Sequence, residues 1–81
     1  MHHTHQLHLT VGPEPGVLDR IVGICRARRC EIVTLHFHAA DAHAPGAVRL
    51  SVHAPPRRVD LLADRLAGLV DVRAVTAERR R

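Results

Sequence analysis

Apolar and polar residues alternate along four short segments of the chain, and a period of two is typical of a strand with one buried face. The segments are residues 7–11, 30–40, 47–53 and 70–75. In the third segment the alternation predicts that Val48, Leu50 and Val52 point into the core. The second segment carries Val33, Leu35, Phe37 and Ala39 on one face. Its other face carries Ile32, Thr34, His36 and His38.

Two further segments have the period of an amphipathic helix, with apolar residues at i, i+3, i+4 and i+7. The first follows Pro15, which suits a helix start because its missing N–H would be unpaired there anyway. Its predicted buried stripe is Leu18, Ile21, Val22 and Cys25. The second begins at the prolines of residues 55–56, and its predicted stripe is Val59, Leu62, Ala63 and Leu66.

The order of these segments is β-α-β-β-α-β, which predicts an α+β fold: a ferredoxin-like sandwich with both helices on one face of an antiparallel four-stranded sheet. We expect the spatial strand order 4-1-3-2 and one domain over residues 1–81, with an ordered core at 5–77 and frayed tails at 1–4 and 78–81. The uncovered face of the sheet is expected to carry His8, Thr10, His36, His38, Arg49, Ser51 and His53.

Composition narrows the function. The chain is 46% hydrophobic with one Phe and no Trp or Tyr, so its core is built from aliphatic residues. A domain of 81 residues has a small core, and we expect it to need a partner for stability. The net charge of +4 comes from scattered arginines and predicts a solvated surface. Cys25 is expected in the core and Cys30 at an exposed position. The sequence contains no membrane span or secretion signal, so we expect a cytoplasmic protein.

Four chemistries find little support in the residues. RNA-binding sheets stack bases on aromatic side chains, which the predicted open face lacks except for imidazole. Copper carriers of this fold need cysteines in the first loop, and that loop, GPEPG, has none. His36, His38 and His53 share the open face, but no acid or cysteine of fixed spacing completes a metal set. The chain also has no nucleophile motif, so catalysis is not expected.

The loop at residues 12–16 leaves two interpretations open. It joins the first strand to the first helix, so the amides of Gly16 and Val17 lie near a helix N-terminus, which suits a carboxylate or phosphate. Glycine-bearing loops are also common as plain turns, and spacing alone favours this simpler reading.

Residues 15–35, PGVLDRIVGICRARRCEIVTL, resemble the opening of an ACT domain, a βαββαβ module that senses amino acids. The resemblance is closest to the small regulatory subunit of acetolactate (acetohydroxyacid) synthase, with the pattern P/S-G-x-L-x-R-I-x-G-L-F-x-x-R-G-Y/F-x-I-x-S-L. The matching positions are Gly16, Leu18, Arg20, Ile21, Gly23, Arg28, Ile32 and Leu35. Residues 59–75 are similar to the family's ending, and the short length resembles the isozyme II type.

The resemblance implies an effector site at the first loop and the start of the second strand. Its positions here are Pro13, Glu14, Gly16, Val17, Glu31 and Ile32. Pro13 and Glu31 stand where valine-responsive members carry Asn. Pro13 has no N–H to donate, and Glu31 brings a negative charge towards the carboxylate of valine. We therefore expect a degenerate site that keeps the Gly16 amide and does not respond to valine.

The resemblance also implies partners. ACT domains of this family pair through helix one and strand two, which places Arg26, Arg29 and Glu31 at a homodimer seam. A docking face of His36, His38, Arg49 and His53 is then expected to bind the catalytic subunit of acetolactate synthase. That subunit holds thiamine diphosphate, magnesium and FAD, whereas this chain is expected to bind no cofactor or metal, no nucleic acid and no membrane. The alternative function is a free-standing ACT sensor that binds another amino acid and regulates a different enzyme.

Overall fold

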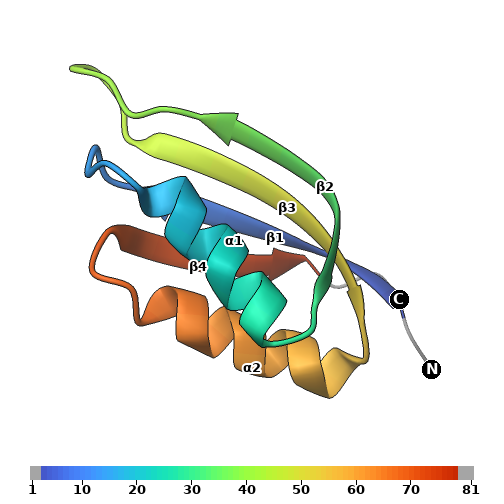
Figure 1. The fold of residues 1–81 in the computed structure, drawn as a ribbon. Coiled ribbons are helices and arrows are strands. Elements are labelled where there is room, and N and C mark those ends of the chain that lie inside the picture. The colour runs from blue at the N-terminus through green and yellow to red at the C-terminus, as the bar shows by residue number, and fades with distance from the viewer. Residues whose placement is uncertain (1–2, 79–81) are drawn as a thin grey trace.

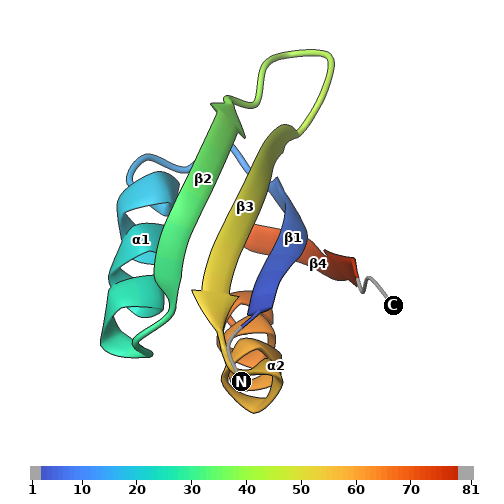
Figure 2. The ribbon, with the colours of Figure 1, turned by 90° about the vertical axis from the view of Figure 1, so that its right-hand side faces the viewer.

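The computed structural model describes residues 3–78, which form four strands and two helices in the predicted order (Figure 1). The elements are β1 (His3–Val11), α1 (Val17–Ala27), β2 (Glu31–His38), β3 (Gly46–Ala54), α2 (Pro56–Ala67) and β4 (Val72–Glu78). The strands form one antiparallel sheet of order β2-β3-β1-β4, which is the predicted order read from the other edge. In Figure 2 the strands β2, β3 and β1 lie side by side, with α1 on the left next to β2 and α2 at the bottom.

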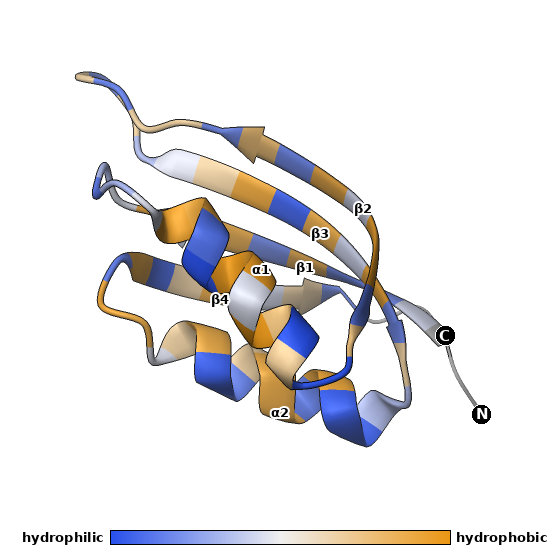
Figure 3. Ribbon diagram, in the orientation of Figure 1, coloured by the Kyte–Doolittle hydropathy of each residue, from blue (hydrophilic) through white to orange (hydrophobic). Residues whose placement is uncertain are grey.

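The core lies between the sheet and the two helices. Strands β1 and β3 pair Leu7 with Leu50 and Leu9 with Val48, and all four side chains are buried. The helices close this layer with Val17, Ile21 and Cys25 from α1 and with Val59, Leu62 and Leu66 from α2. The alternation of apolar and polar residues along β3 is visible in Figure 3. The inward positions predicted for β3 are therefore confirmed.

Strand β2 departs from the predicted alternation because it contains a bulge. Ile32 lies opposite Val52 and Thr34 lies opposite Ser51, so Val33 is the extra residue without a partner in β3. A bulge shifts the alternation by one position. The prediction was therefore wrong for Ile32, which packs against the core, and for Val33, which is 53% exposed.

Three other expectations need correction. Cys30 was expected to be exposed but is buried, since it packs between the end of α1 and the start of α2. The last strand begins at Val72 and not at Val70, which lies in the preceding turn and is 95% exposed. In α1, Val17 takes a buried position, while Leu18 and Val22 are only partly buried.

The ends of the sheet reach further than the predicted core of 5–77. Thr4 pairs with His53 on β3, and Glu78 pairs with Gln6 on β1, so both belong to strands and not to frayed tails. Residues 1–2 and 79–81 of the predicted tails lie outside the described residues.

Candidate functional site

The loop between β1 and α1 is shaped by Gly16, which precedes the helix. Gly16 has φ of 82°, a left-handed conformation that costs an L side chain roughly 1–2 kcal/mol. Its carbonyl oxygen accepts the N–H of Arg20 at 3.1 Å, which closes the first turn of α1. The sequence GPEPG thus places a glycine at the one position of this loop that needs a positive φ.

A partly buried ion pair fixes this loop to the turn between α2 and β4. The Arg20 guanidinium pairs with the Asp71 carboxylate, whose side chain is only 4% exposed, and also donates to the carbonyl of Pro15 at 3.1 Å. The Gly12 N–H donates to the carbonyl of Asp71 at 2.9 Å. The hydrogen bond from Arg20 holds the pKa of Asp71 below its ordinary value, against the opposing effect of burial. The loop is therefore held by side-chain and backbone contacts to a turn distant in sequence.

Glu14 places a carboxylate inside the same loop. Its Oε1 atom is buried and has no hydrogen-bond partner within residues 3–78. This oxygen lies over Gly12, where a side chain at position 12 would collide with it. A buried acceptor without a donor disfavours another anion beside it. An anion that approached this oxygen would therefore be repelled.

The two halves of the predicted effector site lie at opposite ends of α1. Pro13, Glu14, Gly16 and Val17 precede the helix, whereas the Glu31–Ile32 pair follows it. The 11 residues of α1 separate the two groups by about 16 Å at the usual rise per residue. One chain alone does not bring these residues together.

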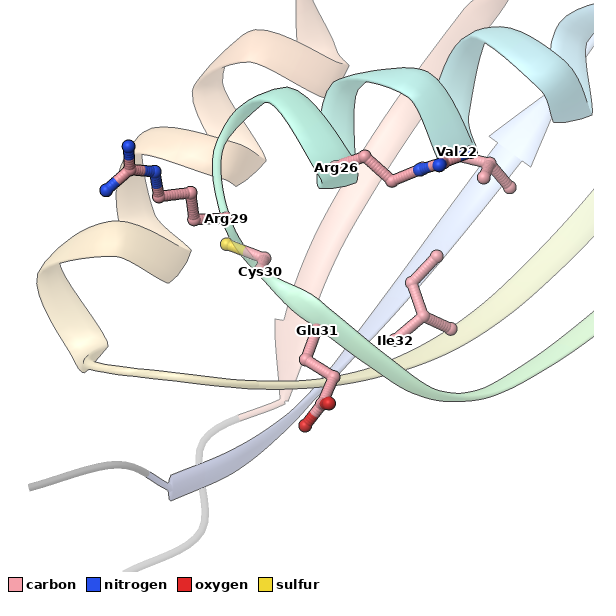
Figure 4. Close-up of a pocket in the computed structure, with 6 residues that line it drawn as sticks. All are labelled: Val22, Arg26, Arg29, Cys30, Glu31 and Ile32. Carbon is pink, nitrogen blue, oxygen red and sulfur yellow. The ribbon is translucent and has the colours of Figure 1, made fainter.

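A groove runs between α1 and β2, at the free edge of the sheet (Figure 4). It has a volume of about 520 Å³ and is lined by Val22, Arg26, Arg29, Cys30, Glu31 and Ile32. Val22 and Ile32 project from facing elements, while the Glu31 carboxylate and the Arg29 guanidinium point away from them. Phe37, further along β2, is 42% exposed. The groove therefore has an apolar floor next to an unpaired strand edge.

The uncovered face of the sheet carries the four predicted docking residues. His36, Arg49 and His8 lie directly opposite one another across β2, β3 and β1. His36, His38 and Arg49 are exposed, and His53 is partly buried. Ser51 lies on the same face but is buried. The sequence therefore predicted the members of this face, and the structure places them on neighbouring strands.

Two acidic residues of this face were missed by the sequence analysis. Glu31 lies opposite His53, and the Glu78 carboxylate lies 3.3 Å from the Nε2 atom of His8. Extending the alternation of the last strand beyond Val75 would have placed Glu78 on this face with Thr76. Glu31 precedes Ile32 and therefore lies on the opposite face from it. The bulge at Val33 turns Ile32 towards the core and Glu31 towards the open face, and the sequence pattern alone does not reveal this bulge. Within residues 3–78 no group of three or more metal-binding side chains is placed to hold a metal ion.

Comparison with known proteins defines the fold. No protein-family model and no curated protein matches the sequence at a significant level. The structure is similar to the ACT domain of GTP pyrophosphokinase from Chlorobium tepidum, with a TM-score of 0.83 and 15% identity over 96% of this chain and 100% of that chain. It is also similar to the acetolactate synthase small subunit from Thermotoga maritima, with a TM-score of 0.80 and 17% identity. That match covers 93% of this chain and 47% of the small subunit.

A third similar structure is a formyltetrahydrofolate deformylase from Burkholderia mallei. Its TM-score is 0.75 at 26% identity, and the match covers 95% of this chain and 28% of the deformylase. The chain therefore has the ferredoxin-like ACT fold, as predicted. In the described part of the chain, neither helix is long and apolar enough to cross a membrane.

Proposed function

We propose that this chain is a non-catalytic small subunit that activates a thiamine-diphosphate-dependent acetolactate synthase in branched-chain amino-acid synthesis. The observation that carries the proposal is that a sequence resemblance and a structural similarity point to the same class of protein. Residues 15–35 resemble the opening of such subunits, and the fold is similar to the small subunit from Thermotoga maritima. The thiamine diphosphate, magnesium and FAD of the complex then belong to the catalytic subunit.

In this proposal the effector site has lost its response to valine. Pro13 removes a backbone donor, and Glu14 and Glu31 add two carboxylates at the positions expected to face an amino-acid ligand. Like charges repel the carboxylate of valine. The subunit therefore activates its partner whether or not valine is present.

The groove between α1 and β2 supports a homodimer through these elements. The free edge of β2 offers unpaired backbone groups, and Val33 and Phe37 are 53% and 42% exposed beside it. A second copy would cover this apolar surface and give a small domain more buried area. In a dimer of this kind the first loop of one copy could approach the start of β2 in the other copy, whereas α1 separates the two segments within one chain.

The proposal is tested by measuring acetolactate formation by the catalytic subunit from the same organism, with and without this protein, across a valine titration. Activation without inhibition by valine is the expected result. Activation with valine inhibition would show that the loop still binds the effector. An absence of activation would contradict the proposed function.

A free-standing ACT sensor is the second candidate. It is favoured by the similarity to the ACT domain of the GTP pyrophosphokinase from Chlorobium tepidum, which is an ACT domain of an enzyme other than acetolactate synthase. A sensor must bind its effector, whereas an activating subunit need bind none. Calorimetry against the twenty amino acids therefore separates the two, since binding of a single amino acid without activation of the synthase supports the sensor.

A further inference from the structure

A pocket also lies where the first loop, the loop before β3 and the start of β4 meet. The first loop contributes Gly12 and Pro13 to its wall, the loop before β3 contributes Asp41 and its neighbours, and β4 contributes Arg73. The volume of about 450 Å³ is within the range of small-molecule sites. The Glu31–Ile32 pair of the predicted effector site does not line this pocket. It is therefore a separate candidate site, and one chain alone builds it.

Arg73 places an unpaired guanidinium at this pocket. Its side chain is exposed and has no hydrogen-bond or ion-pair partner among residues 3–78. Its Nη2 atom lies 3.0 Å from the point where a Cβ atom at position 12 would stand, so the lack of a side chain at Gly12 gives the guanidinium room. The Glu14 Oε1 atom also lies over Gly12, but it is buried and out of reach of an occupant. The guanidinium donors are therefore available to an outside acceptor.

Asp41 places a carboxylate at the same pocket. Its Oδ1 atom accepts the backbone N–H groups of His43 and Ala44 at 2.7 and 2.9 Å. These two bonds, with a smaller contribution from His38, hold the pKa of Asp41 below its ordinary value against a small opposing effect of burial. The carboxylate is therefore ionised at neutral pH. Its Oδ2 atom accepts no hydrogen bond within residues 3–78, so this oxygen is available to an outside donor.

The two charges line one pocket without neutralising each other, since Arg73 and Asp41 form no ion pair. A guanidinium fork fits a carboxylate, and a carboxylate oxygen accepts the N–H of an ammonium. A lone anion would also meet the carboxylate of Asp41, and a lone cation would meet the guanidinium of Arg73, so each would lose by repulsion part of what it gains. The rest of the wall is largely small and apolar: Pro13, Ala40, Ala42, Ala44 and Pro45. The pocket therefore matches a molecule with both charges on a short aliphatic chain.

We propose that this pocket binds a small zwitterion, with the carboxylate of the ligand on Arg73 and its ammonium on Asp41. The inference goes beyond the proposed function, because the site needs neither a catalytic subunit nor a second copy of the chain. Opposite charges from two segments hold the two ends of the ligand. Recognition therefore depends on the presence of both charges in one molecule.

The first experiment titrates the isotope-labelled protein with glycine and with γ-aminobutyrate at neutral pH and follows the NMR shifts of its backbone amides. The two probes carry the same charges at different separations. We expect saturable shifts at Gly12, Asp41 and Arg73 with at least one probe, with a Kd of roughly 1–10 mM. No saturable shift with either probe overturns the proposal. Shifts confined to the Glu31–Ile32 pair and α1 would place binding at the predicted effector site and also overturn it.

Singly charged analogues test whether both charges are used. Methylamine and acetate each keep one charge of glycine, and propylamine and butyrate each keep one charge of γ-aminobutyrate. Each analogue is expected to bind at least about tenfold more weakly than its parent, because one charge-assisted hydrogen bond is lost. An analogue that binds as tightly as its parent would show that one charge suffices, which overturns the proposal.

Matched variants locate the site. Asp41→Asn with Arg73→Gln removes both charges, and the asparagine oxygen can still accept the two N–H groups of the loop. Asp64→Asn with Arg65→Gln makes the same changes at exposed positions of α2. The first variant is expected to bind the zwitterion at least about tenfold more weakly, and the second is expected to bind it unchanged. Unchanged binding by the first variant, or equal losses in both, overturns the proposal.

The outcome is independent of the synthase. Circular dichroism shows that each variant is folded, and none of the samples contains a catalytic subunit. Failure of zwitterion binding with intact activation of the synthase therefore removes this inference and leaves the proposed function in place. Zwitterion binding without activation removes the proposed function and leaves this site.

Discussion

The two faces of the sheet differ in the polarity, the charge and the solvent exposure of their side chains. The face beneath the helices contains aliphatic residues, and Leu7, Leu50 and Val52 on it are at most 1% exposed. The other face contains histidines, threonines, an arginine and two glutamates, most of them in contact with solvent. Along each strand, successive residues point to one face and then to the other. The comparison indicates that one face provides stability and the other is available for recognition.

Two adjacent residues of β3 test this division directly. Leu50 is 1% exposed under the helices, whereas Arg49 is exposed on the open face. Leu50→Ala is expected to lower the free energy of unfolding by about 2–5 kcal/mol, because it removes buried carbons and leaves a cavity. Arg49→Ala is expected to change it by no more than about 0.5 kcal/mol. Urea denaturation measures both, and similar losses in the two variants would contradict the division.

Two glycines test how the covered layer is connected to the candidate loop. Gly16→Ala is expected to cost about 1–2 kcal/mol, because residue 16 has φ of 82° and its Cβ would lie 3.1 Å from the Arg20 guanidinium. Gly23→Ala is the matched control, since a Cβ there meets nothing within 4 Å and alanine favours the helix by roughly 0.5–1 kcal/mol. Thermal unfolding should therefore shift in opposite directions. A shift in the same direction would mean that α1 does not begin after Gly16.

The pairing of Arg20 with Asp71 predicts a dependence of stability on pH. The pKa of Asp71 is lowered in the folded state, so the folded carboxylate binds fewer protons than the unfolded one. Its contribution is complete above the ordinary Asp value of about 3.9 and is lost as the pH falls through the lower folded value. Asp71→Asn should flatten the fall of the urea midpoint below pH 4. The exposed Asp64→Asn variant is the control and should follow the unmodified protein.

The smallest effect concerns the two cysteines of the covered layer. Burial, with a smaller contribution from Cys30, raises the pKa of Cys25 to about 11, and burial also raises that of Cys30. Because the thiolate is the reactive form, both thiols should react slowly with Ellman's reagent at pH 8 in the folded protein. Both should react at once in denaturing urea. Rapid reaction of either thiol without urea would show that the covered layer opens readily.

The sequence predicted best where one regular pattern determined the structure. The alternation in β3 and the helical stripe of α2 placed Leu50, Val59 and Leu62 correctly, because tertiary contacts reinforce the local period there. The bulge at Val33 could not be predicted, since Ile32 and Val33 are equally apolar and only pairing with β3 decides which one is inward. The Arg20–Asp71 pair joins residues 51 positions apart, and no local pattern indicates such a contact.

The candidate site shows the same limit. The members of the open face followed from alternation, whereas its acidic residues did not, because Glu31 precedes the bulge and Glu78 follows the predicted end of the last strand. The buried Oε1 atom of Glu14 depends on the conformation of the loop and not on its sequence alone. Side-chain chemistry was therefore predictable from the sequence, but its spatial grouping depended on strand register.

The most direct test of the account is activation of the acetolactate synthase catalytic subunit by the protein and by two triple variants. His36→Ala, Arg49→Ala and His53→Ala together remove three of the four docking residues. Arg57→Ala, Arg65→Ala and His43→Ala remove two arginines and one histidine at exposed positions off this face. The account predicts that the first variant stays folded and loses activation, while the second activates as the unmodified protein does. Undiminished activation by the first variant would contradict the assignment of the open face to the partner enzyme.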